Sequence, residues 1–289
     1  MKARTAIIDA AMVGAAVILP SRVAARWLEG ALAVSLLITL LLGAATTVAQ
    51  PALFTVHTEA AELAGHQVQV DVFLPAAELP TGVAIVAHGF TRSRARHQDL
   101  GRSLAAAGVI VVIPDLPYIL DHWGNGKAIV ELAHKLEAGA LGLPPTERSH
   151  LVLVGTSAGG LATVLAAAKL PGLGGWVGLD PVDRTGSGIR AASQLTSPAI
   201  VLLAEPSSCN LYGSGGSIAQ AAPTLLRSTF LHGASHCDFE GPTNKLCRVV
   251  CGQSSAEMRA LAREETVTAV VEMLGTPHTT PTSEPESAE

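Results

Sequence analysis

The stretch LVLVGTSAGGL, residues 151–161, joins a continuous apolar run to an Ala- and Leu-rich segment through the pattern G-x-S-x-G. An apolar run of this length is typical of a strand buried on both faces, and the segment behind it has the composition of a helix. A serine on the sharp turn between them needs small neighbours, because the strand and the helix approach closely there. The helix also points its first N–H groups at negative charge that develops beside the serine. We therefore predict that Ser157 is a nucleophile at the carboxyl end of a buried strand.

Similar units flank this stretch on both sides. Short apolar runs alternate with helix-like segments; the runs span residues 83–87, 109–114, 176–180, 198–204 and 228–234, and the helix-like segments span 100–107, 127–140 and 159–170. This alternation predicts an α/β fold with a mostly parallel central sheet and helices on both faces. Residues 52–74 alternate with period two, which predicts antiparallel strands at the N-terminal edge. Because only residues 181–197 separate two late strands, no large lid is expected.

Composition and charge narrow the class of protein. Of the 289 residues, 48% are hydrophobic and 15% are charged, and the formal net charge is −5. This composition suits a packed globular core and excludes disorder of the whole chain. Without a long basic run, nucleic acid is not expected as a partner. We expect residues 52–275 to form one α/β domain and the Pro-, Ser-, Thr- and Glu-rich tail, residues 276–289, to be disordered.

The N-terminal segment, residues 1–49, has the pattern of a signal peptide or a membrane anchor. Residues 31–49, ALAVSLLITLLLGAATTVA, are apolar without a charge, and Arg22 and Arg26 precede them. The final TVA is a small-x-small cleavage pattern. An uncleaved anchor of about 20 residues is the alternative, since roughly 30 residues make a long leader before a signal core. We expect a secreted or periplasmic protein, or one anchored to a membrane by residues 31–49.

The cysteines are concentrated in the last third of the chain, at Cys209, Cys237, Cys247 and Cys251. An even number of cysteines behind an export signal predicts two disulfides, for which three pairings are possible. Zinc is the competing interpretation, but the spacing lacks a Cys-x-x-Cys pair. We therefore expect disulfides and no metal.

A nucleophilic serine needs a base, and His236 is the best candidate. It lies in the segment HGASHCDF, in a loop of small residues just beyond the last predicted strand. Catalytic groups gather at the carboxyl ends of parallel strands, and a late histidine gives the order serine, acid, histidine. His232, within or at the end of the same predicted strand, is the weaker candidate.

Three carboxylates compete to be the acid that orients this base. Asp180 ends the apolar run WVGLD at the edge of the sheet where Ser157 is expected. A buried carboxylate is costly unless it is paired, and a catalytic histidine would be its partner. Asp183 also fits a turn or a helix N-cap. Glu205 follows the next strand, where the acid of many such proteins lies. We rank Asp180 first and keep Asp183 and Glu205 as alternatives.

Backbone N–H groups are expected to stabilise the oxyanion of the reaction. One belongs to Ala158, directly after the nucleophile. The other is expected from Phe90, in the loop AHGFTRSRA after the first parallel strand, where His88 and Gly89 allow a sharp turn. His88 itself is expected to brace this loop and not to take part in the chemistry.

Together these segments resemble the α/β-hydrolase superfamily, and within it the chlorophyllase-like and dienelactone-hydrolase-like serine esterases. The resemblance covers about residues 83–240 and rests on AHGFTRS, VGTSAGG, WVGLDPVD and GASHCDF. Chlorophyllases are similar in an HGY-type loop, a GHSRGG elbow and a DPV segment, whose aspartate corresponds to Asp180. The resemblance thus implies the α/β-hydrolase fold and favours Asp180 over Asp183. Ala158 replaces the arginine of the chlorophyllase elbow, and 3% aromatic residues do not indicate a porphyrin pocket.

These patterns predict an exported serine esterase in which Ser157, His236 and Asp180 cleave carboxylic esters through an acyl-enzyme, without a cofactor. The expected substrate is a small-molecule or lipid-like ester, with polyester and aryl esters also open. From other classes, a noncatalytic α/β-hydrolase-fold binding protein and a zinc-stabilised exported domain are the alternatives.

Overall fold

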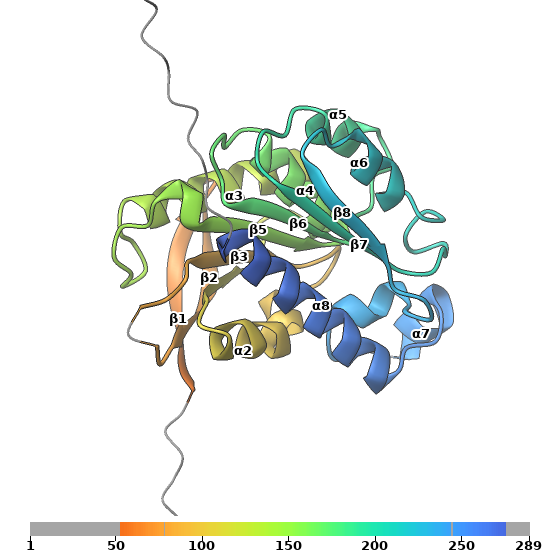
Figure 1. Ribbon diagram of the computed structural model, residues 1–289, viewed down its shortest axis with the longest axis horizontal. Coiled ribbons are helices and arrows are strands. Elements are labelled where there is room, and N and C mark those ends of the chain that lie inside the picture. Colours follow the sequence, from red (N-terminus) through yellow and green to blue (C-terminus); the bar gives the residue numbers. More distant parts are fainter. Residues whose placement is uncertain (1–52, 78, 244, 276–289) are drawn as a thin grey trace, which may run out of the picture. The chain divides into compact units, whose positions relative to one another are not determined.

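The strands of this chain form one mixed sheet (Figure 1). The computed structural model describes residues 53–77, 79–243 and 245–275; the expected leader, residues 1–49, and the expected disordered tail, residues 276–289, lie outside them. Within the described residues the strand order is β1-β2-β4-β3-β5-β6-β7-β8. The strands are β1 (Phe54–Leu63), β2 (His66–Pro75), β3 (Val83–Ala87), β4 (Ile110–Pro114), β5 (Leu151–Thr156), β6 (Gly175–Leu179), β7 (Ala199–Leu203) and β8 (Leu225–Phe230).

The strand directions confirm the prediction of a mostly parallel sheet with an antiparallel edge. β1 pairs antiparallel with β2, which pairs antiparallel with β4. From β4 to β8 every pair of neighbours is parallel. Both faces of the central strands are buried: Leu151 and Leu153 of β5 pack into one core, and Val152 and Val154 into the other. This two-sided burial is why the strands are continuous apolar runs in the sequence.

Helices cover both faces of the sheet, as Figure 1 shows. One core includes side chains of α3 (His122–Glu137), α4 (Ala158–Ala167), α5 (Ser187–Ala192) and α6 (Gly215–Ala221). The opposite core includes side chains of α2 (Gln98–Ala106) and α8 (Ala256–Gly275). The remaining elements are α7 (Lys245–Cys251) and the 3₁₀ helices η1 (Arg94–His97), η2 (Arg148–His150) and η3 (His236–Phe239).

A buried tryptophan ties α4, the helix that follows the predicted nucleophile, to β6, the next strand along the chain. Trp176 of β6 is fully buried, and its indole Nε1–H donates to Thr163 Oγ1 of α4 at 3.0 Å. A buried indole N–H requires such a partner, because an unpaired buried donor costs about 1–3 kcal/mol. The contact therefore fixes α4 against the sheet at low cost.

Several boundaries differ from the sequence prediction. α3 begins at His122 and not at Lys127, because the Asp121 carboxylate accepts the N–H of Gly124 (2.8 Å) and caps an earlier turn. β8 covers Leu225–Phe230, whereas the run 228–234 was expected. Its residues alternate between exposed and half-buried, as suits an edge strand, so no continuous apolar run marks it.

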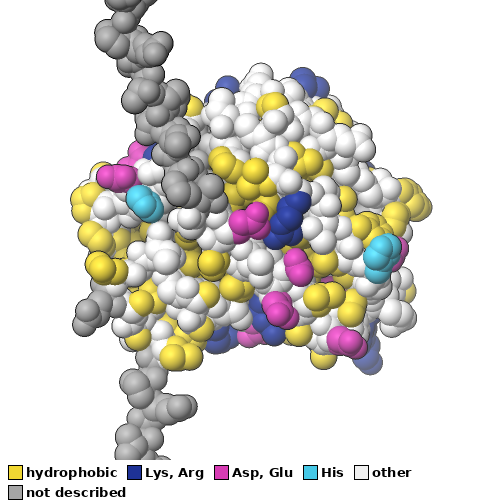
Figure 2. Space-filling model, in the orientation of Figure 1, with side chains coloured by type: hydrophobic (Ala, Val, Ile, Leu, Met, Phe, Trp, Pro, Cys, Tyr) yellow, Lys and Arg dark blue, Asp and Glu magenta, His cyan; other side chains and the backbone are white. Residues whose placement is uncertain are grey.

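The surface near the carboxyl ends of the strands is not covered by a large lid in the described part of the chain. Residues 181–197, which lie between β6 and β7, contain only the short helix α5. No helix within the described ranges is long and apolar enough to span a bilayer. On the face seen in Figure 2, acidic and basic side chains are interspersed among apolar and neutral ones.

Candidate active site

Ser157 lies on the turn between β5 and α4. Its φ of 56° and ψ of −120° are strained for a residue with a side chain; such a conformation costs about 1–3 kcal/mol and persists only where the surroundings impose it. Here the Ser157 N–H donates to the Leu179 carbonyl (3.0 Å), and the Ser157 carbonyl accepts from the Val182 N–H (3.2 Å). The neighbouring strand and the loop after it therefore hold the turn.

Close backbone approaches require the glycines around Ser157. A Cβ on Gly155 would lie 2.4 Å from both the Gly159 carbonyl oxygen and Thr163 Oγ1. A Cβ on Gly159 would lie 2.4 Å from the His88 carbonyl oxygen. These separations are well inside van der Waals contact, so even alanine would force the backbone to move. The G-x-S-x-G pattern is thus a steric requirement of the strand–turn–helix junction.

Three side chains from separate loops meet at this turn. His236, at the start of η3, has Nε2 2.9 Å from Ser157 Oγ and Nδ1 2.6 Å from Asp180 Oδ2. In the sequence, His236 lies 56 positions after Asp180 and 79 positions after Ser157. With Nδ1 carrying a proton toward the carboxylate, Nε2 is free to accept the serine proton. The arrangement is that of a nucleophile, a base and an acid that orients the base.

Asp180 is fully buried directly after β6. Its Oδ1 accepts the N–H of Ala204 (3.2 Å), and its Oδ2 accepts from Asn210 Nδ2 (3.0 Å) in addition to His236. Burying an ionised carboxylate is tolerated only when its oxygens are hydrogen-bonded or paired with a cation. These three donors meet that requirement for Asp180.

Asn210 is a site residue that the sequence pattern did not indicate. It is fully buried, and besides Asp180 its Nδ2 donates to the Glu205 carbonyl (3.0 Å). Its Oδ1 accepts from the N–H groups of Ser207 (2.8 Å) and Gly213 (3.1 Å). In the sequence it is one asparagine in a polar loop, and no local pattern distinguishes it. Through these hydrogen bonds, Asn210 connects the loop after β7 to the Asp180 carboxylate.

The other two candidate acids have different partners. Asp183 accepts from the N–H groups of Gly188 (2.8 Å) and Thr185 (3.0 Å), and so stabilises the turn that leads into α5. Glu205 accepts from the N–H of Gly233 (3.0 Å), and its side chain is 49% exposed. His232 is the weaker base candidate, and its Nδ1 lies 3.9 Å from Glu205 Oε1. Neither Asp183 nor Glu205 is hydrogen-bonded to His236.

The loop after β3 passes close to the serine, as expected for an oxyanion loop. Phe90 and Ala158 line a shared small pocket there, together with Gly89. His88 braces this loop: its Nε2 accepts the Leu116 N–H (2.9 Å), so the protonated Nδ1 donates to the Gly89 carbonyl (2.9 Å). Burial, the largest effect, lowers the pKa of His88, although contacts with Gly89 and Glu240 oppose the shift. The lowered pKa keeps His88 neutral, as its accepting role requires.

A cavity of about 350 Å³ opens beside Ser157 and His236. Phe90 and Val250 contribute apolar surface to it. The charged side chains in its wall are Arg92, Arg96, Arg184 and Glu240. Its volume is at the lower end of the range for small-molecule pockets. A small acyl or alcohol group would therefore fit beside the serine.

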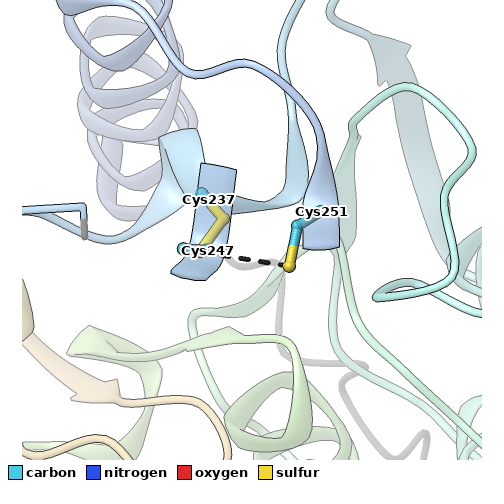
Figure 3. A group of neighbouring side chains, drawn as sticks. All are labelled: Cys237, Cys247 and Cys251. Carbon is cyan, nitrogen blue, oxygen red and sulfur yellow. Dashed lines mark hydrogen bonds between the residues drawn. A yellow bond between two sulfur atoms is a disulfide. The ribbon is translucent and has the colours of Figure 1, made fainter. Parts of the chain in front are cut away.

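Two disulfides flank this cavity, and they resolve the pairing that the sequence left open. Cys237, next to His236, is bonded to Cys247, and Cys209 is bonded to Cys251. Figure 3 shows that Cys251 lies close to the Cys237–Cys247 pair; its Sγ is 4.0 Å from Cys247 Sγ. The sulfurs of Cys237, Cys247 and Cys251 lie within 4.8 Å of one another, but zinc binds thiolates and not disulfides. The paired arrangement therefore favours disulfides over the zinc interpretation.

The sheet order, the strained serine turn and the late histidine define an α/β-hydrolase fold. No protein-family model and no curated protein matches the sequence. Among solved structures, the chain is similar to dienelactone hydrolase from Anabaena variabilis, with a TM-score of 0.61 and 15% sequence identity. The match covers 76% of this chain and 98% of that one. The similarity confirms the α/β-hydrolase fold that the sequence predicted.

Proposed function

We propose that this chain is a serine hydrolase that cleaves carboxylic esters. The observation that carries the proposal is the unbroken hydrogen-bonded series from Ser157 Oγ through His236 to Asp180, with separations of 2.9 and 2.6 Å. A serine hydroxyl is a weak nucleophile, and an adjacent base held by a third group is the arrangement that activates it. The α/β-hydrolase fold supports the same conclusion by analogy.

In the first half-reaction Ser157 Oγ attacks the ester carbonyl while its proton passes to His236 Nε2. The imidazolium that forms is stabilised by the buried Asp180 carboxylate 2.6 Å from Nδ1. The N–H groups of Ala158 and Phe90 are proposed to stabilise the negative charge on the former carbonyl oxygen. His236 then protonates the leaving alkoxide, which departs as an alcohol and leaves an acyl-Ser157.

In the second half-reaction water hydrolyses this acyl-enzyme. His236 Nε2 removes a proton from the attacking water, and the same N–H groups stabilise the second tetrahedral intermediate. Collapse of this intermediate breaks the ester bond to Ser157 Oγ, which regains its proton from His236. The products are one carboxylic acid and one alcohol, and the side chains return to their starting protonation states.

The substrate class and the location of the protein are parts of the same proposal. The cavity suits a small acyl or alcohol group, and because the described residues form no large lid, the rest of a lipid-like or polymeric ester can extend across the surface. The apolar segment 31–49 and the two disulfides support export, because disulfides persist in oxidising compartments.

A fluorophosphonate probe, which reacts only with an activated serine, tests this proposal against a noncatalytic binding protein of the same fold. We expect the wild-type protein to be labelled and to hydrolyse p-nitrophenyl butyrate, and Ser157→Ala to do neither. Absence of both labelling and turnover in the folded wild-type protein would favour the binding protein.

A further inference from the structure

A second carboxylate, that of the largely but not fully buried Glu240, lies in the wall of the active-site cavity and has no role in the steps above. It directly follows η3, four residues after His236, and its side chain is 11% exposed. Its Oε1 accepts the backbone N–H of Gly89 at 2.5 Å. This hydrogen bond joins the loop that carries the base to the loop that carries Phe90.

Two side chains near Glu240 favour its anionic form: the cation Arg92 and the ionisable His97. Arg92 Nε lies 3.5 Å from Oε2, and Nε2 of the fully buried His97 lies 3.5 Å from Oε1. Burial, the largest effect, would raise the pKa of Glu240, but the contacts with His97 and with the Gly89 N–H act in the opposite direction, and the pKa is lowered. A negative charge near an oxyanion would oppose catalysis, so the nearby cationic side chain of Arg92 makes the position tolerable.

Gly89 lies between Glu240 and the nucleophile. A Cβ on Gly89 would be 3.1 Å from Glu240 Oε1 and 3.3 Å from Ser157 Cβ. The Gly89 N–H is bound by Glu240, while its carbonyl accepts from His88 Nδ1 (2.9 Å) and the Arg92 N–H (3.2 Å). Since a trans peptide is planar, a fixed Gly89 carbonyl also fixes the opposite direction of the Phe90 N–H.

We propose that Glu240 is a positioning residue: it holds the His88–Gly89 peptide and, through the Gly89 Cα, helps to position the adjoining Gly89–Phe90 peptide relative to Ser157 and His236. The proposal rests on the esterase function, because it assigns Glu240 to the geometry of the oxyanion donor. Loss of the carboxylate releases the Gly89 N–H and lets the donor loop move independently of the histidine loop. A displacement of about 1 Å in such a site can lower the rate about a hundredfold.

Kinetics of Glu240→Ala and Glu240→Gln, with p-nitrophenyl butyrate and with active sites titrated by fluorophosphonate, test this role. Glutamine keeps an oxygen that can accept from Gly89, whereas alanine does not. We expect kcat per titrated site to fall about tenfold to a hundredfold in Glu240→Ala, below the roughly 10²–10³ lost with an entire oxyanion donor. Glu240→Gln is expected to stay within about fivefold of the wild type, because the acceptor remains.

Phenylboronic acid supplies a readout that a purely structural role would not change. Its tetrahedral adduct with Ser157 places an oxygen where the oxyanion forms, so its inhibition constant should rise in Glu240→Ala by the factor by which kcat/KM falls. Glu137→Gln is the matched control: Glu137 is also ion-paired, with Arg148 (2.5 Å), has a lowered pKa and lies away from the active-site cavity. We expect no change in kcat there.

The possible results separate the two proposals. Wild-type kcat and boronate affinity per titrated site in Glu240→Ala would overturn the positioning role while leaving the esterase function intact. The positioning role is also overturned if a smaller fraction of titratable active sites accounts for the whole loss of activity in Glu240→Ala, because such a loss indicates misfolding. A folded wild-type protein without labelling or turnover would instead overturn the esterase function and the role of Glu240 with it.

Discussion

Replacing Asp180 by asparagine should abolish most activity through the protonation state of His236. The Oδ1 of Asp180 accepts from Ala204 N–H, so the asparagine oxygen is expected to keep that place and its Nδ2 to replace Oδ2. This Nδ2 would then face two donors, His236 Nδ1–H and Asn210 Nδ2. Two donors cannot bond to each other, and His236 can escape only by moving its proton to Nε2. With a proton on Nε2, the histidine cannot accept the proton of Ser157.

The expected magnitude follows from this wrong tautomer. The corresponding change in the serine protease that serves as the general model of such triads lowers kcat about 10⁴-fold, which is about 5 kcal/mol of transition-state stabilisation. We expect a loss of the same order here. The clash of donors should also lower the free energy of unfolding by about 1–3 kcal/mol.

Initial rates with p-nitrophenyl butyrate, on protein shown to be folded by its melting temperature, measure this effect. Asp183→Asn and Glu205→Gln are the matched controls, because their carboxylates bind turn N–H groups and not His236; we expect their kcat within about threefold of the wild type. Near-normal activity of Asp180→Asn, with a large loss in either control, would refute the assignment of the acid.

Three further outcomes are expected. Asn210→Ala should lower kcat about tenfold or more, since a hydrogen bond to a charged group contributes about 1.5–3 kcal/mol; unchanged steady-state rates would exclude this support of Asp180. Reducing both disulfides should lower the melting temperature and the activity together, because closing a loop of about 10 residues, as Cys237–Cys247 does, contributes about 3 kcal/mol to the free energy of unfolding. A thiol assay verifies the reduction, and an unchanged melting temperature would contradict the expectation. The pKa of His88 in the folded protein lies below its ordinary 6.5, so below that pH the unfolded chain binds more protons than the folded protein does. The neutral His88 therefore contributes stability that is fully present above pH 6.5 and is lost as the pH falls toward the pKa of the folded state. Urea unfolding from pH 7.5 to 5.0 should therefore show a steeper loss in the wild type than in His88→Gln, and parallel curves would count against it.

The class of fold was predictable because its signals are local. Each central strand is buried on both faces and is therefore a continuous apolar run, and the turn at Ser157 needs glycines at fixed positions. The edge strand β8 was misplaced for the opposite reason: with one face exposed, it has no continuous run to mark it. α3 was predicted to begin too late, because the Asp121 cap and not the apolar periodicity decides its first turn.

Candidate side chains were harder to rank than elements. Ser157 was identified from its own neighbours in the sequence. His236 and Asp180 were chosen from their places at strand ends and, for the aspartate, from a family resemblance. Asp183, only three residues away, remained an alternative because a carboxylate in a turn and one facing a histidine look alike in a sequence. The structure brings Asp180, and not Asp183, to His236; its catalytic role remains a prediction.

By itself, the sequence determined the alternation of strands and helices, the turn that bears Ser157 and the carboxylates and histidines that could serve it. Only the tertiary structure decided which of these side chains meet, how the cysteines pair, and that Asn210 and Glu240 belong to the site. The physical reason is that helix and strand formation depends on residues a few positions apart. Hydrogen bonds such as Glu240–Gly89 join residues 151 positions apart, and their partners become neighbours only when the sheet has assembled.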